Sequence, residues 1–233
     1  MALGQVEYAD GDIALTGWLA LPEGAAKAAV VIFPTIMNRN AAMDRRAQML
    51  ADAGYVAMIA DFYGEIPADF AASQALSATL KADVDAYRAR IAAGIAALRA
   101  HPAAAALPLA AIGYCQGGQA VLEAARGGED LVLVASFHGL LNTDRKADRP
   151  IAPRVLVCHG DADPLAPRDH VLAFWEEMDA VGAKWHFHSY SGVRHGFTDP
   201  GSDARGLAAI GYDASADRQS WSALTSLLDE VIG

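Results

Sequence analysis

The chain has 233 residues with 28 acidic and 18 basic side chains, so its formal net charge is −10, and 53% of its residues are hydrophobic. This composition is typical of a compact globular protein and excludes an intrinsically disordered chain. Because phosphate binding needs a basic face and the sequence has no run of lysines and arginines, we expect no nucleic-acid partner.

Targeting and redox signals predict a cytoplasmic protein. The two cysteines, Cys115 and Cys158, are too few for a secreted disulfide scaffold. Residues 1–12 show neither the basic start nor the apolar stretch of a signal peptide. The longest apolar run, residues 103–115, contains Pro108 and is too short to span a bilayer, so we expect no membrane association.

The first predicted element is a β-hairpin over residues 6–21. Hydrophobic residues alternate at period two from Ile13 to Leu21, and Asp10-Gly11 is a two-residue turn signal. This hairpin should form an antiparallel edge of a sheet.

Strands and helices then alternate along the rest of the chain. Further strands are predicted, mostly from apolar runs, over residues 28–33, 55–60, 109–112, 131–137, 155–159 and 184–190. Helical spacing predicts helices over residues 40–53, 77–100, 119–126, 168–181 and 215–232, with Asn40 as the cap of the first. This alternation predicts an α/β fold with a mostly parallel central sheet and helices on both faces.

The sequence has no internal repeat and no linker-like tract, which predicts a single domain over residues 1–233. Ligands of such sheets bind beyond the carboxyl ends of the strands. The segments 64–77 and 200–213 flank this region, and whether they act as lids is left open.

A tight turn at Cys115 is the most informative motif. The strand over residues 109–112 leads into Gly113-Tyr114-Cys115-Gln116-Gly117, and a helix follows directly. A side chain lifted out of such a turn needs neighbours without a Cβ two positions before and after it, and Gly113 and Gly117 supply them. The pattern is that of a nucleophile elbow with cysteine in place of serine.

A thiol needs a base, and the base needs an orienting acid. His195 lies in a glycine-flanked loop after a predicted strand and is the candidate base. Asp163, whose turn is fixed by Pro164, is favoured as the acid over Asp161. The order nucleophile, acid, histidine is that of α/β-hydrolases. The backbone N–H of Gln116 should help to hold the oxyanion, with a second donor near Thr35 or Ile36.

The other histidines and Cys158 have structural interpretations. Cys158 lies inside an apolar strand and should belong to the core. His138 and His159 close apolar strands and are expected to be hydrogen-bonded groups of the core or rim. His186 and His188 share one strand face, but no third ligand accompanies them, so we expect neither a metal nor a cofactor.

The combined motifs resemble those of the dienelactone hydrolase family. Gly-Tyr-Cys-Gln-Gly-Gly is similar to its nucleophile motif, His-Gly-Asp-Ala-Asp-Pro to its acid loop and Arg-His-Gly-Phe to its histidine loop. The resemblance covers roughly residues 5 to 232. It implies the α/β-hydrolase fold, the triad Cys115, Asp163 and His195, and Ile36 and Gln116 as oxyanion donors.

Three positions depart from the family members that open dienelactone. Thr35 stands where they carry a glutamate that gates the thiol, and Glu65 and Asp199 stand where they carry arginines for the substrate carboxylate. Two acidic groups at those positions should repel a carboxylate, which predicts a neutral or cationic substrate. Arg194, beside His195, is a further candidate for the substrate pocket.

The sequence therefore predicts a hydrolase that cleaves a small carboxylic ester, lactone or thioester through an acyl-enzyme, as a monomer or small homo-oligomer. A thioesterase or acyltransferase on the same triad is one alternative. A non-catalytic binding or redox-sensing protein that keeps the elbow thiol is another, and a metal-dependent hydrolase using His186 and His188 is a weaker one.

Overall fold

The structure is a computed structural model that describes residues 3–233. The chain divides into two compact units, residues 1–111 and 112–233. The first two residues of the predicted domain lie outside the described part, and the single domain over residues 1–233 stays a prediction. None of the helices in the described part has the length and apolar character of a membrane span.

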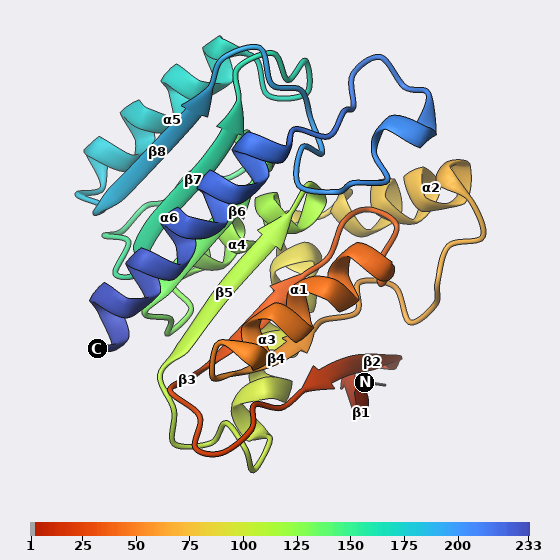
Figure 1. The fold of residues 1–233 in the computed structure, drawn as a ribbon, viewed down its shortest axis with the longest axis vertical. Coiled ribbons are helices and arrows are strands. Elements are labelled where there is room, and N and C mark those ends of the chain that lie inside the picture. The colour runs from red at the N-terminus through yellow and green to blue at the C-terminus, as the bar shows by residue number, and fades with distance from the viewer. Residues whose placement is uncertain (1–2) are drawn as a thin grey trace. The chain divides into compact units, whose positions relative to one another are not determined.

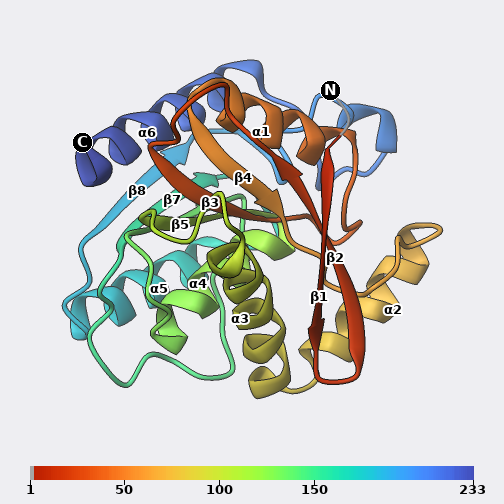
Figure 2. The ribbon, with the colours of Figure 1, turned by 90° about the horizontal axis from the view of Figure 1, so that it is seen from below.

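The first unit is built on the N-terminal hairpin. Its elements are β1 (Gly4–Asp10), β2 (Ile13–Ala20), β3 (Ala28–Phe33), α1 (Ala41–Asp52), β4 (Tyr55–Ile59), α2 (Phe70–Lys81) and α3 (Val84–Ala100). β2 runs antiparallel to both β1 and β4, whereas β3 and β4 are parallel. Asp10 pairs with Ile13, so the hairpin turn is Gly11-Asp12, one residue later than predicted. α1 and α3 lie on opposite faces of these strands (Figure 2).

The second unit continues the alternation. β5 (Leu109–Tyr114) runs across the division of the chain, and the elements after it are α4 (Gln116–Gly127), β6 (Leu133–Phe137), β7 (Arg154–Gly160), α5 (Arg168–Ala180), β8 (Trp185–Tyr190), a 3-10 turn (Asp203–Arg205) and α6 (Ala214–Ile232). β6, β7 and β8 pair in parallel. α6 lies on one face of these strands, and α4 and α5 lie on the other (Figure 2).

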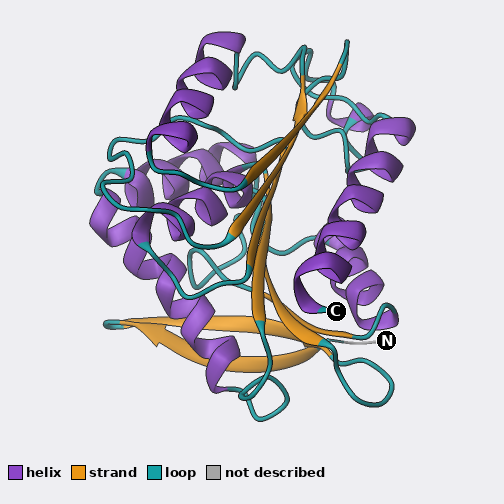
Figure 3. Ribbon diagram, turned by 90° about the vertical axis from the view of Figure 1, so that its left-hand side faces the viewer, coloured by secondary structure: helices purple, strands orange, loops and turns teal. Residues whose placement is uncertain are grey.

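The strands follow the sheet order β1-β2-β4-β3-β5-β6-β7-β8 (Figure 1). The sheet is mostly parallel with an antiparallel N-terminal edge, and its strands are drawn in orange in Figure 3. Every residue of β3, β4, β5 and β6 is buried, as expected of parallel strands covered on two faces. The predicted α/β fold class is thus confirmed.

The single helix predicted over residues 77–100 is wrong, because two helices occupy this region. Asp83 separates them: its carboxylate accepts hydrogen bonds from the backbone N–H groups of Asp85 and Ala86 and so caps α3. Asp69 caps α2 in the same way, because its carboxylate accepts the backbone N–H of Ala72. α2 therefore begins within the segment 64–77. Side-chain acceptors of this kind compete with helix continuation, and alanine-rich periodicity does not reveal them.

A buried carboxylate organises the loops that follow β3 and β4. Asp61, which is 3% exposed, lies just after β4. It accepts four hydrogen bonds, from Nδ2 of Asn38 (2.7 Å) and from the backbone N–H groups of Thr16, Tyr63 and Gly64. Asn38, with φ of 59°, in turn accepts a hydrogen bond from the Phe62 N–H. This network fixes the segment that carries Thr35 and Ile36.

Replacing Asp61 with alanine should therefore lower the free energy of unfolding by about 3 kcal/mol or more, since several buried donors lose their acceptor. Urea unfolding followed by circular dichroism measures this loss. Asp12→Ala, in the exposed hairpin turn, is the matched control and should change stability by less than about 0.5 kcal/mol. Equal stability of the two variants would contradict the structural role of Asp61.

Candidate active site

Cys115 stands at the apex of a strained strand-to-helix turn, as predicted. Its backbone has φ of 58° and ψ of −115°, a conformation that non-glycine residues rarely adopt. A Cβ on Gly113 would lie 1.8 Å from the Gly117 carbonyl oxygen, so only glycine fits there. The thiol is half-buried, and Gln116, 2% exposed, is the first residue of α4. The N–H groups in the first turn of an α-helix have no acceptor within the helix. The backbone N–H of Gln116 can therefore donate a hydrogen bond to an anion.

The helix behind the elbow is anchored by buried charges. Arg126, on α4, is fully buried and donates hydrogen bonds to the carboxylates of Glu123 and Glu177 and to the Leu141 carbonyl. Because a buried guanidinium is tolerated only when it is paired, this cluster fixes α4 against α5 and against the loop after β6.

His195 and Asp163 form a buried pair. Nδ1 of His195 lies 2.7 Å from Oδ2 of Asp163, and the two residues are 3% and 2% exposed. Oδ1 of Asp163 accepts the backbone N–H of Leu165, which fixes the carboxylate. The orientation leaves Nε2 as the ring nitrogen that can exchange a proton with a thiol or substrate.

Asp161 is placed differently from Asp163. Its carboxylate forms two hydrogen bonds with Arg168, at 3.0 and 2.7 Å, on the exposed surface. These bonds hold the pKa of Asp161 below its usual range. Asp163 is therefore the acid that the fold brings to His195.

The loop that carries His195 is tied into the surrounding backbone. The His195 N–H donates to the Ala209 carbonyl at 3.1 Å, and its carbonyl accepts the Gly211 N–H at 3.0 Å. A Cβ on Gly160 would lie 2.4 Å from the Val193 carbonyl oxygen, so glycine allows the histidine loop to approach β7. The segment 200–213 thus contacts His195 directly, and its role as a lid stays a prediction.

The charge state of His195 depends on three effects. Burial, the largest, disfavours the charged ring. A charge on Cys115 and hydrogen bonds with Asp163 and Cys115 outweigh it and raise the pKa of His195 to about 10. Nε2 of His195 is buried, and both the charge of Cys115 and a hydrogen bond with it stabilise the protonated ring.

The predicted pocket residues of the first unit belong to the network around Asp61. Oγ1 of Thr35 accepts hydrogen bonds from the Met37 N–H and from Nδ2 of Asn40, and it thereby closes the turn after β3. The Ile36 carbonyl accepts the Tyr63 hydroxyl at 3.2 Å. The side chain of Glu65 is exposed.

Asp199 does not carry the unbalanced negative charge that the sequence suggested. Its carboxylate forms an ion pair with Arg205 and accepts the Gly201 N–H at 2.8 Å. Arg194 donates to the Ala208 carbonyl at 3.1 Å and lies 3.8 Å from Asp203. The ion pair with Arg205 offsets the negative charge of Asp199, and the repulsion of a substrate carboxylate by Asp199 stays a prediction.

Two further residues were not recognised as parts of the site from sequence. Asn38 holds the turn of Thr35 and Ile36, and His138 contacts both the elbow and His195. A histidine directly after a buried strand, at the sheet edge that carries the elbow, was the available signal for His138.

His159 lacks the expected hydrogen bonds: both ring nitrogens are unpaired among the described residues, and burial lowers its pKa.

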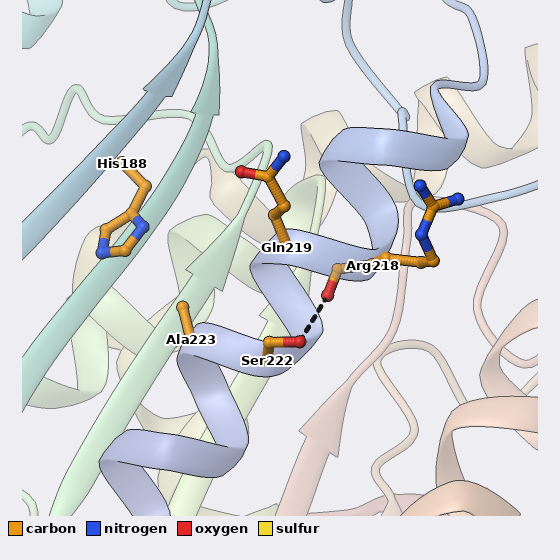
Figure 4. Close-up of a pocket in the computed structure, with 5 residues that line it drawn as sticks. All are labelled: His188, Arg218, Gln219, Ser222 and Ala223. Carbon is orange, nitrogen blue, oxygen red and sulfur yellow. Dashed lines mark hydrogen bonds between the residues drawn. The ribbon is translucent and has the colours of Figure 1, made fainter.

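The described residues contain no group of three or more histidine, cysteine or acidic side chains that could hold a metal ion. His186 lies 3.3 Å from Arg154, and the neighbouring His188 lines an open cavity of about 570 Å³ between β8 and α6 (Figure 4). The other lining residues are Arg218, Gln219, Ser222 and Ala223. None of the predicted triad lines this cavity, so it is distinct from the candidate active site.

Known proteins place the chain in a family. The profile of the dienelactone hydrolase family matches residues 15–232. The structure of the dienelactone hydrolase-like promiscuous phosphotriesterase P91, from metagenomic libraries, is 32% identical, has a TM-score of 0.94 and matches over the full length of both chains. The structure named m3DLH is 35% identical, with a TM-score of 0.93 over 99% of this chain and 98% of its own. A probable 2-oxo-3-(5-oxofuran-2-ylidene)propanoate lactonase from Bradyrhizobium sp is 28% identical over 201 residues, 78% of each protein. The chain therefore belongs to the dienelactone hydrolase family of hydrolases.

Proposed function

We propose that the protein hydrolyses a small carboxylic ester, lactone or thioester with Cys115 as nucleophile, His195 as base and Asp163 as orienting acid. The buried 2.7 Å contact between His195 and Asp163, in the same unit as the strained Cys115 turn, is the observation that carries this proposal. The name of the Bradyrhizobium relative is consistent with lactone chemistry.

The reaction begins with a thiolate at Cys115. The Cys115 thiolate attacks the carbonyl carbon, and the backbone N–H groups of Gln116 and Ile36 are the proposed donors to the oxyanion. The tetrahedral intermediate collapses when the leaving oxygen or sulfur takes a proton from Nε2 of His195. Nε2 then removes a proton from water, which attacks the thioester and releases the acid and the Cys115 thiolate. Asp163 holds the ring in one tautomer throughout.

The substrate class follows from what the loops provide. Neither position 65 nor position 199 offers an arginine, and Arg205 is already paired with Asp199. A substrate carboxylate would have to compete for that pair, whereas a neutral acyl group needs no such partner. We therefore propose a substrate without a carboxylate close to the reacting carbonyl.

Phosphotriester hydrolysis is a second candidate, favoured by the likeness to P91 over the full chain. A phosphotriester is neutral and so suits a pocket without a free arginine. The Cys115 thiolate would attack phosphorus, the aryloxide would leave, and water would then cleave the phosphorus–sulfur bond.

The first test compares p-nitrophenyl esters and acyl-CoA thioesters with dienelactone. Cys115→Ala should lower kcat/KM by about 10³-fold or more, and His195→Ala should accumulate an acyl-enzyme visible by mass spectrometry. Cys158→Ala is the control and should retain activity, because Cys158 is buried in β7. Activity that survives Cys115→Ala would place the nucleophile elsewhere, and efficient turnover of dienelactone would refute the substrate class.

A second test measures how strongly His195 favours the thiolate. Since the pKa of His195 is raised to about 10, its ring stays protonated beside the thiolate through neutral pH. The rate of Cys115 alkylation by iodoacetamide should therefore fall little between about pH 9 and about pH 6. In His195→Gln it should fall below about pH 8.5, as for an ordinary thiol.

Mass spectrometry distinguishes the two cysteines in this experiment. Burial raises the pKa of Cys158 to about 12, so that thiol should stay unmodified at every pH. Identical pH profiles for the wild type and His195→Gln would contradict the thiolate–imidazolium pair.

The third test is paraoxon hydrolysis by the wild type and Cys115→Ala, followed by release of nitrophenolate. If the second candidate is correct, the wild type turns over and Cys115→Ala loses at least about 10²-fold in rate. A single burst without turnover would mean that phosphotriesters only inactivate the thiol.

A further inference from the structure

His138 is a strained residue next to the candidate triad, to which neither the proposed mechanism nor the family motifs assign a role. It follows β6 directly, is 2% exposed and has φ of 40°. Among residues 3–233, only Asn38 and Cys115 are other non-glycine residues with positive φ. Strain of this kind persists only where surrounding contacts enforce it, and it is often found at functional sites.

The ring of His138 joins the elbow to the histidine loop. Nδ1 accepts the backbone N–H of Cys115 at 3.1 Å, a donor that is shared with the Phe137 carbonyl at 3.0 Å. Nε2 lies 2.9 Å from Oγ1 of Thr198, a buried residue three positions after His195. Because a backbone N–H can only donate, Nδ1 must be unprotonated, and the ring proton is therefore on Nε2 and points to Thr198.

The same ring packs against His195. The centroids of the His138 and His195 rings are 5.1 Å apart with an interplanar angle of 68°, and His138 meets Phe197 edge-on at 5.3 Å. A single side chain thus contacts the backbone of Cys115, the ring of His195, and the two residues Phe197 and Thr198. A shift of His138 would change the separation of Cys115 and His195.

We propose that His138 is a positioning residue. Its neutral ring bridges the Cys115 backbone and the His195 ring and fixes their position relative to each other. The assignment rests on the proposed function for its catalytic meaning. A charged His138 would lose its acceptor nitrogen and would place a positive charge 5.1 Å from a protonated His195, so the bridge works only in the neutral form.

The test replaces His138 with asparagine, glutamine and alanine. The Oδ1 atom of asparagine can take the place of Nδ1 as acceptor for the Cys115 N–H, and asparagine tolerates positive φ. The amide of glutamine is one methylene further out and cannot accept that bond in the same place. His138→Asn should therefore keep iodoacetamide reactivity of Cys115 at pH 7 within about threefold of the wild type. His138→Gln and His138→Ala should lose about 10- to 100-fold.

Two more variants keep the test informative if His138→Ala fails to fold. Thr198→Val removes the second anchor of the ring without touching the elbow, and it should lower kcat while leaving KM within about twofold. His188→Ala, on the exposed face of β8, is the matched histidine control and should behave as the wild type in both assays. Thermal melting verifies that each variant is folded.

The outcomes separate this inference from the proposed function. If the wild type hydrolyses esters but all folded His138 variants alkylate and turn over as the wild type, the inference is wrong and the proposed function stands. If His138→Asn loses as much reactivity as His138→Gln, the hydrogen bond to Cys115 is not the cause and the inference is also wrong. If the wild type hydrolyses nothing but the alkylation series follows the expected order, the bridge is supported and the hydrolase proposal fails.

Discussion

The close approach of two backbone segments at the elbow is the constraint on which the candidate site depends. The distance of 1.8 Å between a hypothetical Cβ on Gly113 and the Gly117 carbonyl oxygen means that any side chain at position 113 would force the turn open. Only with the turn closed does Cys115 adopt its positive φ, with the N-terminus of α4 directly after it. The position of the thiol and that of the oxyanion donor proposed at Gln116 therefore both depend on the two glycines.

The strain at the elbow is balanced by buried polar contacts. The guanidinium of Arg126 anchors α4 through its hydrogen bond to Glu177. His138, which follows β6, accepts a hydrogen bond from the Cys115 backbone. The Arg126 contacts are buried and that of His138 is part-buried, so both are stronger than on the surface and costly to leave incomplete. The Asp61 network has the same character in the first unit, where it fixes the turn of Thr35 and Ile36. Rigid loops of this kind suit a site that has to hold developing charge without rearranging.

The proposed preference for a neutral acyl or phosphoryl group rests on the electrostatics of the histidine loop. Arg205 is paired with Asp199, and Arg194 lies 3.8 Å from Asp203, so each of these arginines has an acidic neighbour within its own loop. In the proposed mechanism, the reactive charge is confined to His195, Asp163 and the thiol of Cys115. Binding of the substrate would then depend on shape and apolar contact, and such sites discriminate weakly between related acyl groups.

The sequence by itself determined the elements that depend on local chemistry and periodicity. Strand 28–33, the Asn40 cap and the elbow glycines could be predicted because their signals lie within a few residues of one another. The order Cys115, Asp163, His195 predicted a triad, because parallel strands bring their carboxyl ends to one edge, and the structure brings His195 to Asp163. The tertiary structure alone decided which partner each polar side chain finds. It placed Arg168 on Asp161, Arg205 on Asp199 and His138 between the elbow and His195. The split between α2 and α3 has a local signal as well, the Asp83 cap, which the helical pattern over residues 77–100 obscured. The bonds of His138 join segments 23 and 60 residues apart, so no local signal could fix them. The pairs of Asp161 with Arg168 and of Asp199 with Arg205 are only seven and six residues apart, and they depend on loop conformations that periodicity does not encode.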